Sequence, residues 1–245
     1  MSAEGASSIA QSQLDLYDFF SMLLPGTYLL IGLIPLLPDS LPLGTIGSAV
    51  VLLVGGYVVG RAIHSAAERY DERNDIPSHR DDFIYELKTD ELGLMNSDSK
   101  DRFYQIASKE FDLSTPTSRS NASDADLAAL YVHVRSKLYQ HGNVRSQSFQ
   151  AIYAFYRSAH FATIIIVFCY LGYGIGDFLE VWTSIGSYST YIGKLDLPFP
   201  LFLLSAEIVL ILSLVTLRDA KHDYRLYFIE YLFADYLSIT CDTNT

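Results

Sequence analysis

Four stretches of the chain contain almost no charged residue, and each is about as long as a membrane-spanning helix. They run from Phe19 to Leu37, from Leu41 to Gly60, from Ala159 to Phe178 and from Leu197 to Leu217. A helix rises 1.5 Å per residue, so about twenty apolar residues cross the roughly 30 Å hydrocarbon core of a bilayer. Buried helices of a soluble core are the alternative, but four such runs in 245 residues favour membrane spans. The pattern predicts an all-α integral membrane protein with four transmembrane helices.

The region between the second and third stretches is polar and has the spacing of amphipathic helices. Ser78 with Asp81, and Ser123 with Asp126, are spaced as in the capping boxes that begin helices. The clearest apolar stripe follows the second pair and contains Leu127, Leu130, Tyr131, Val134 and Leu138. Tyrosine-rich stripes also precede the third stretch and follow the fourth, and helical spacing continues after the second stretch with Ile63, Ala66, Ala67 and Tyr70. We therefore expect spans two, three and four to continue as helices that pack with a helical insert.

The lysines and arginines fall almost entirely on one side of the predicted spans. Thirteen lie between Arg61 and Arg157 and three follow the fourth span, whereas Lys194 alone lies between spans three and four. Connections rich in Lys and Arg remain in the cytoplasm. The charge pattern predicts a multi-pass protein of the cell membrane whose two termini and insert are cytoplasmic.

These patterns divide the chain into five segments. Residues 1–18 form a cytoplasmic N-terminal segment, 19–63 the first two transmembrane helices, and 64–158 a cytoplasmic helical domain. Residues 159–217 form the third and fourth transmembrane helices, and 218–245 a cytoplasmic C-terminal helix.

The composition narrows the class of protein further. The net charge is −11, and 19 aspartates stand against 9 glutamates, which resembles the halophilic composition of haloarchaeal proteins; an acidic mesophilic protein is the alternative. An acidic chain disfavours a nucleic-acid partner. The two cysteines form no disulfide framework, the six histidines form no metal-binding pattern, and no nucleotide-binding or serine-hydrolase motif occurs. We expect no cofactor, no metal and no enzymatic activity.

Glu207 is the one carboxylate within the fourth apolar stretch. A charge at this depth is costly, so we expect it to face other helices or a water-filled path. It is then either an ion or proton site or a hydrogen-bond partner of a neighbouring span. No second charge at membrane depth is available to pair with it.

Glycines at a spacing of four residues mark candidate helix-packing surfaces. Gly56 and Gly60 lie in the second span and Gly172 and Gly176 in the third. Small residues at this spacing let helices approach closely, either within one subunit or between subunits. Pro25, next to Gly26, and Pro35 interrupt the first span and predict a kink, which is either static or a hinge.

Basic side chains are concentrated at the predicted inner membrane surface. Arg61 and His64 follow the second span, Arg157 and His160 border the third, and Arg218 follows the fourth. The basic residues of the second and third spans, which are Arg61, His64, Arg157 and His160, could form a cationic ring. This ring would bind anionic lipid head groups or line a pore mouth. Simple anchoring of the spans at the cytoplasmic surface is the alternative.

Arg135 and His141 are separated by five residues, on or just beyond the clearest helix of the insert. The spacing resembles the Arg-x(4-6)-His signature of HEPN ribonucleases, in which the pair acts on RNA phosphate and ribose across a dimer. That resemblance implies a membrane-tethered ribonuclease with Arg135 and His141 as catalytic residues. Arg73 and His79 have the same spacing across a predicted turn, and ordinary solvated side chains are the alternative interpretation.

The leading hypothesis is a non-enzymatic membrane protein that forms a homo-oligomer in the lipid bilayer. Its cytoplasmic helices would bind a protein or small-molecule signal and bias the spans, with a channel-like opening as one outcome. A small transporter that uses Glu207 as its coupling site is a further alternative.

Overall fold

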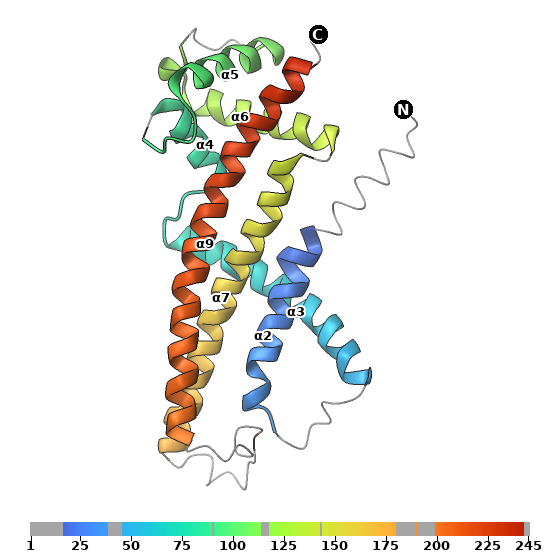
Figure 1. Ribbon diagram of the computed structural model, residues 1–245, viewed down its shortest axis with the longest axis vertical. Coiled ribbons are helices and arrows are strands. Elements are labelled where there is room, and N and C mark those ends of the chain that lie inside the picture. The colour runs from blue at the N-terminus through green and yellow to red at the C-terminus, as the bar shows by residue number, and fades with distance from the viewer. Residues whose placement is uncertain are drawn as a thin grey trace. The chain divides into compact units, whose positions relative to one another are not determined.

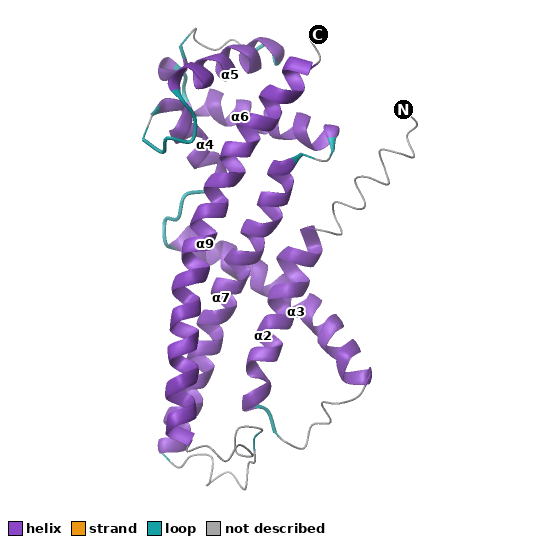
Figure 2. Ribbon diagram, in the orientation of Figure 1, coloured by secondary structure: helices purple, strands orange, loops and turns teal. Residues whose placement is uncertain are grey.

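The computed structural model describes residues 17–38, 46–89, 91–113, 118–142, 144–179, 190 and 199–242. Within these residues the chain contains seven α-helices joined by loops (Figures 1 and 2). The only β-type pairing among them is an isolated bridge between Pro38 and Thr190. The prediction of an all-α fold is confirmed.

Four helical segments are long and apolar enough to cross a membrane. The first combines a π-helical turn, η1 (Phe19–Leu23), with α2 (Leu24–Leu33) and a 3-10 turn, η2 (Ile34–Leu36). The others lie in three long helices, α3 (Ile46–Arg73), α7 (Arg145–Phe178) and α9 (Phe199–Asp242). The first residues of the predicted second and fourth spans, 41–45 and 197–198, lie outside the described residues.

Pro25 explains why the first span changes helix type. It occupies the first turn of α2, directly after the π-helical turn, and it has no amide hydrogen to donate. Pro35 lies in the 3-10 turn that ends the same segment.

The chain divides into two compact units. We call Leu14–Tyr70 with Ala154–Lys221 the span unit, and Asp71–Tyr153 with His222–Thr245 the insert unit. Helices α7 and α9 each begin in one unit and end in the other without a break, as expected from the sequence. At 44 residues, α9 is roughly 66 Å long, about twice the thickness of a hydrocarbon core.

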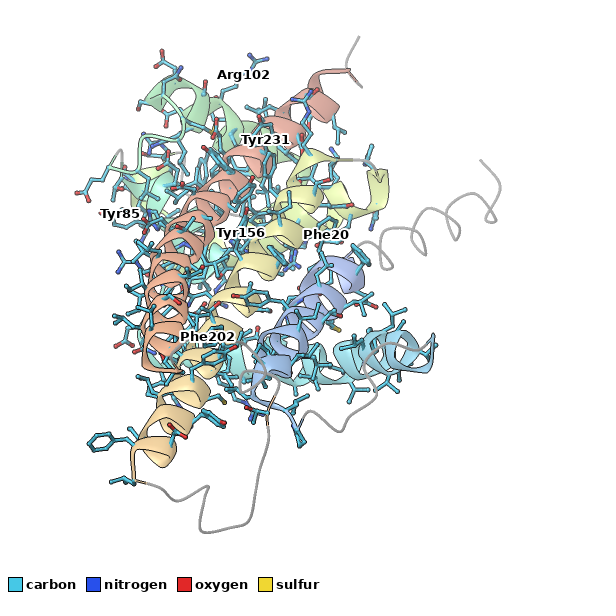
Figure 3. All side chains as sticks on the ribbon, turned by 60° about the horizontal axis from the view of Figure 1, so that its bottom comes forward. Phe20, Tyr85, Arg102, Tyr156, Phe202 and Tyr231 are labelled. Atoms are coloured by element: carbon cyan, nitrogen blue, oxygen red, sulfur yellow. The ribbon has the colours of Figure 1, made fainter. Side chains whose placement is uncertain are left out.

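The span unit has a small core and a large apolar surface. Its buried apolar cluster consists of Leu29, Ile63, Ala162, Ile166 and Tyr170, and Phe202 of α9 packs against this cluster (Figure 3). None of the most apolar window of α9 is buried. Val51, Phe168 and Leu212 are each more than half exposed. An apolar surface of this extent requires lipid or other apolar partners around it.

The insert unit is built around the C-terminal part of α9. Helices α4 (His79–Lys88), α5 (Ser97–Glu110) and α6 (Asp124–His141) gather around it (Figure 1). Both predicted capping boxes are present: the hydroxyls of Ser78 and Ser123 accept from the amides of Asp81 and Asp126. The fully buried aromatic side chains include Phe83, Phe103, Phe228, Phe233 and Tyr236. Nearby, Tyr231 of α9 (Figure 3) stacks on Phe149 of α7, with ring centroids 4.5 Å apart.

Candidate functional site

The first two spans cross at glycines, with backbone against backbone. A Cβ atom added to Gly26 would lie 1.8 Å from the carbonyl oxygen of Gly56 and 2.5 Å from the amide nitrogen of Gly60. A Cβ atom on Gly60 would lie 1.8 Å from the carbonyl oxygen of Met22. Real contacts are never this short, so no larger residue fits unless the helices separate. Gly56 and Gly60 therefore pack within one chain, against the first span.

The glycines of the third span are arranged differently. A Cβ atom on Gly172 would meet nothing within 4 Å, and Gly176 is half-buried. Gly174 is the glycine of α7 that approaches α9, because its Cβ atom would lie 2.8 Å from Cδ1 of Leu203. Sequence spacing did not single out Gly174, since it has no glycine four residues away.

The glycine crossing positions His64, which lies one turn after Gly60 on α3. Its imidazole hydrogen-bonds to the backbone carbonyl of Ser21 at the start of the first span. Pro25 has no amide hydrogen, so it cannot make the usual helical bond to that carbonyl. The side chain of His64 thus joins the first and second spans one helical turn beyond the glycine crossing.

The same imidazole also joins α7. The guanidinium of Arg157 lies 3.1 Å from Nε2 of His64, and the hydroxyl of Ser158 lies 3.4 Å from Nδ1. Glu68, one turn further along α3, lies 3.9 Å from the other terminal nitrogen of Arg157. Tyr17 packs edge-on against the imidazole with a centroid distance of 6.2 Å. We call His64, Arg157, Ser158 and the Ser21 carbonyl the His64 cluster.

The other basic residues predicted for this surface are not gathered in the same way. Arg61 is exposed, and Arg218 is exposed beside Asp219, with 3.4 Å between Nε and Oδ1. His160 is half-buried on α7, one turn after Arg157. Of the predicted ring, the described contacts join only His64 and Arg157 directly.

Glu207 lies on α9 in the span unit and is half-buried. Its Oε1 atom is buried and accepts no hydrogen bond from the described residues. Tyr170 of α7 interacts with it electrostatically, but the hydroxyl of Tyr170 donates to the carbonyl of Gly32 at 3.1 Å. A second polar contact, 2.9 Å between the hydroxyls of Tyr28 and Thr163, also joins spans one and three without involving Glu207.

Arg135 and His141 lie on the same helix, α6. Six residues along a helix place two side chains about 120° apart around its axis. Arg135 lies over the ring of Tyr139, 5.2 Å from its centroid, and Nδ1 of His141 is 3.2 Å from the carbonyl oxygen of Lys137.

Sequence reasoning missed a buried ion pair in the insert unit. Lys100 of α5 and Glu86 of α4 are fully buried, and Nζ lies 2.9 Å from Oε1. Nζ also donates to the carbonyl of Thr89 at 3.0 Å, and Oε1 accepts from the amide of Met95 at 3.0 Å. Helical spacing carried the signal, because Lys100 shares a stripe with the apolar residues at positions 103 and 107.

A second missed pair joins α9 to α4. Nε of Arg225 lies 2.9 Å from Oδ2 of Asp82 without hydrogen-bond alignment, and a terminal nitrogen donates to the carbonyl of Pro77 at 3.0 Å. Burial raises the pKa of Asp82 to about 6, despite the opposing effect of Arg225, and the neighbouring Asp81 raises it further.

Two further features bear on ligands. An open groove of about 560 Å³ lies between α4 and α6, with Arg80, Lys88, Asp81 and Asp124 on its walls. The described residues contain no group of three His, Cys, Asp or Glu side chains placed to hold a metal ion.

Comparison with known proteins gives no relative. The chain matches no protein-family model, no curated protein and no solved structure.

Proposed function

We propose that the protein is a non-enzymatic, oligomeric effector of the cell membrane that responds to a cytoplasmic signal or partner. Both termini and residues 64–158 would lie in the cytoplasm. The observation that carries this proposal is the continuity of α9. The helix contributes Phe202 to the packing of the span unit and Phe228, Phe233 and Tyr236 to the core of the insert unit.

A continuous helix is a stiff connection between the regions it passes through. The insert unit packs around α9 through buried aromatic rings and through the ion pair of Arg225. A conformational change in that unit would therefore act on the same helix that enters the membrane. The groove between α4 and α6 would bind a small molecule or a peptide. The exposed apolar face of α9 leaves area for a second copy in the membrane.

Reconstitution tests the proposal. Purified protein in liposomes should form oligomers that can be cross-linked. These liposomes should release trapped ions when the cytoplasmic ligand or protein partner is added. Asp219 is exposed on α9, three residues before the part of this helix that belongs to the insert unit. Asp219→Pro should break the helix there and remove regulation of the flux, while Asp219→Ala should keep the regulation. A protein that stays monomeric and electrically silent, with its cytoplasmic partner present, contradicts the proposal.

A small transporter is the second candidate, favoured by the buried oxygen of Glu207 that accepts no hydrogen bond from the described residues. A carboxyl in that position can carry a proton. Glu207→Gln should then abolish pH-dependent uptake of a solute, and uptake that is unchanged by this substitution counts against transport.

A further inference from the structure

The hydrogen bonds of His64 define its protonation state. A guanidinium only donates hydrogen bonds, so Nε2 of His64, 3.1 Å from Arg157, must present a lone pair. A backbone carbonyl only accepts, so the bond to Ser21 needs the single N–H of the ring, which is then on Nδ1. The imidazole is neutral, and both of its nitrogens are used.

This arrangement ties three spans together at one point. The Nδ1–H group binds the first span, the side chain belongs to the second, and Nε2 binds Arg157 of the third. Arg157 is nearly buried, with 12% of its side chain exposed, so its contact with the imidazole is poorly screened by water.

We propose that His64 is a proton-responsive staple that holds the third span against the first two while it is neutral and releases it when it is protonated. A proton on Nε2 removes the only acceptor that the ring offers to Arg157. It also places two cations side by side, and like charges at this distance repel strongly in a site of low dielectric. The contact with Arg157 cannot survive protonation.

The neighbouring groups do not cancel this effect. Arg157 from α7 is the cation that faces the ring, Tyr17 contributes an aromatic edge, and Ser158 a hydroxyl. Among the described residues, Glu68 is the acidic group that acts on His64, but its side chain is 56% exposed and 3.9 Å from Arg157. An exposed carboxylate is screened, so it offsets little of the repulsion.

This inference goes beyond the proposed function, because it concerns a distance between helices and holds whether or not ions flow. Nitroxide labels at Ala62 on α3 and Phe168 on α7, both exposed, report the separation of these helices. The labelled protein would carry serine at Cys169 and Cys241. Its distance distribution in lipid nanodiscs would be recorded by pulsed EPR in steps from about pH 7.5 to about pH 4.

With the His64 cluster unsubstituted, the distribution of distances between the two labels should have a single peak at neutral pH. This peak should be lost or displaced in acid. His64→Gln keeps an acceptor and a donor without a charge, so its peak should stay unchanged over the whole range. His64→Lys carries a permanent cation and should show the acid distribution at neutral pH. His160→Gln, on the same surface, should respond to pH like the parent protein.

Two results overturn the proposal. A distance distribution of the parent protein that is the same at every pH shows that the staple does not open, and this needs no substituted protein to fold. A pH response that persists in His64→Gln shows that another group senses the protons.

Discussion

The insert unit and the span unit are both helical, yet different forces hold them together. The insert unit buries a continuous cluster of sixteen apolar residues, several of them aromatic. The buried cluster of the span unit has five members, and the backbones of Gly26, Gly56 and Gly60 lie in close contact in that unit. Water drives the burial of apolar surface, whereas lipid is as apolar as the side chains themselves. Helices in lipid therefore gain most from close backbone approach and from polar contacts.

Truncation of one apolar side chain on α9 should have a large effect on stability in the insert unit and a small effect in the span unit. Phe233 is fully buried in the insert unit, so Phe233→Ala should lower the free energy of unfolding by about 3–5 kcal/mol. Leu212 is 62% exposed in the span unit, and Leu212→Ala should change it by less than about 0.5 kcal/mol. Denaturation in detergent, followed by circular dichroism, measures both. Equal losses for the two variants contradict the difference between the units.

The buried pair Lys100–Glu86 should behave as an ion pair in an apolar core. Lys100→Met leaves Glu86 buried and unpaired, so we expect a loss of about 3–5 kcal/mol. The double change Lys100→Met with Glu86→Leu removes both charges and should recover most of that loss. The same denaturation measurement applies, and a double variant no more stable than the single one argues against this account.

The glycine crossing should tolerate no side chain. In Gly60→Leu the new side chain meets the backbone of Met22, so the span unit should lose about 1–3 kcal/mol or separate outright. Gly172→Leu is the matched control, because a Cβ atom at Gly172 meets open space. Cross-linking between spans one and two should fall in the first variant only; a similar loss in both would mean that backbone contact is unimportant.

A smaller effect is expected from the titration of Asp82. Its pKa is raised from its usual 3.8 to about 6 by burial, so the folded insert unit holds a proton that the unfolded chain has lost. This contribution to stability is complete below about pH 4 and disappears as the pH rises through 6. We expect a decrease on the order of 1 kcal/mol over that interval.

The control for this titration is an exposed aspartate elsewhere in the insert unit. Asp82→Asn should flatten the pH dependence, whereas Asp98→Asn, at an exposed position on α5, should retain it. Stability that instead rises between pH 4 and 6, and does so only when Asp82 is present, contradicts the assignment.

The features predicted from the sequence were those that depend on local pattern. The apolar stretches, the capping boxes at Ser78 and Ser123, and the extension of the spans into long helices all follow from the spacing of neighbouring residues. Gly56 and Gly60 indicated a packing surface, but spacing could not name Gly26 as their partner. Which helix faces which is decided by tertiary packing, and no local pattern encodes it.

The candidate site was predicted less completely for the same reason. His64 and Arg157 were recognised as basic residues near one membrane surface. Their hydrogen bond joins two helices at positions 93 residues apart in sequence, and the hydrogen bond to Ser21 adds a third helical segment. The cationic-ring hypothesis stays a prediction, because the described contacts join only two of its four members, His64 and Arg157.

The proposed topology places the insert unit in the cytoplasm and the apolar segments of four helices in the membrane. Single cysteines, in a background without Cys169 and Cys241, test this directly in intact cells with a membrane-impermeant maleimide. Asp98→Cys on the exposed surface of α5 should react only after the cells are permeabilised, and Lys194→Cys between the third and fourth spans should react at once. Reaction of Asp98→Cys in intact cells, or protection of Lys194→Cys, would contradict the arrangement.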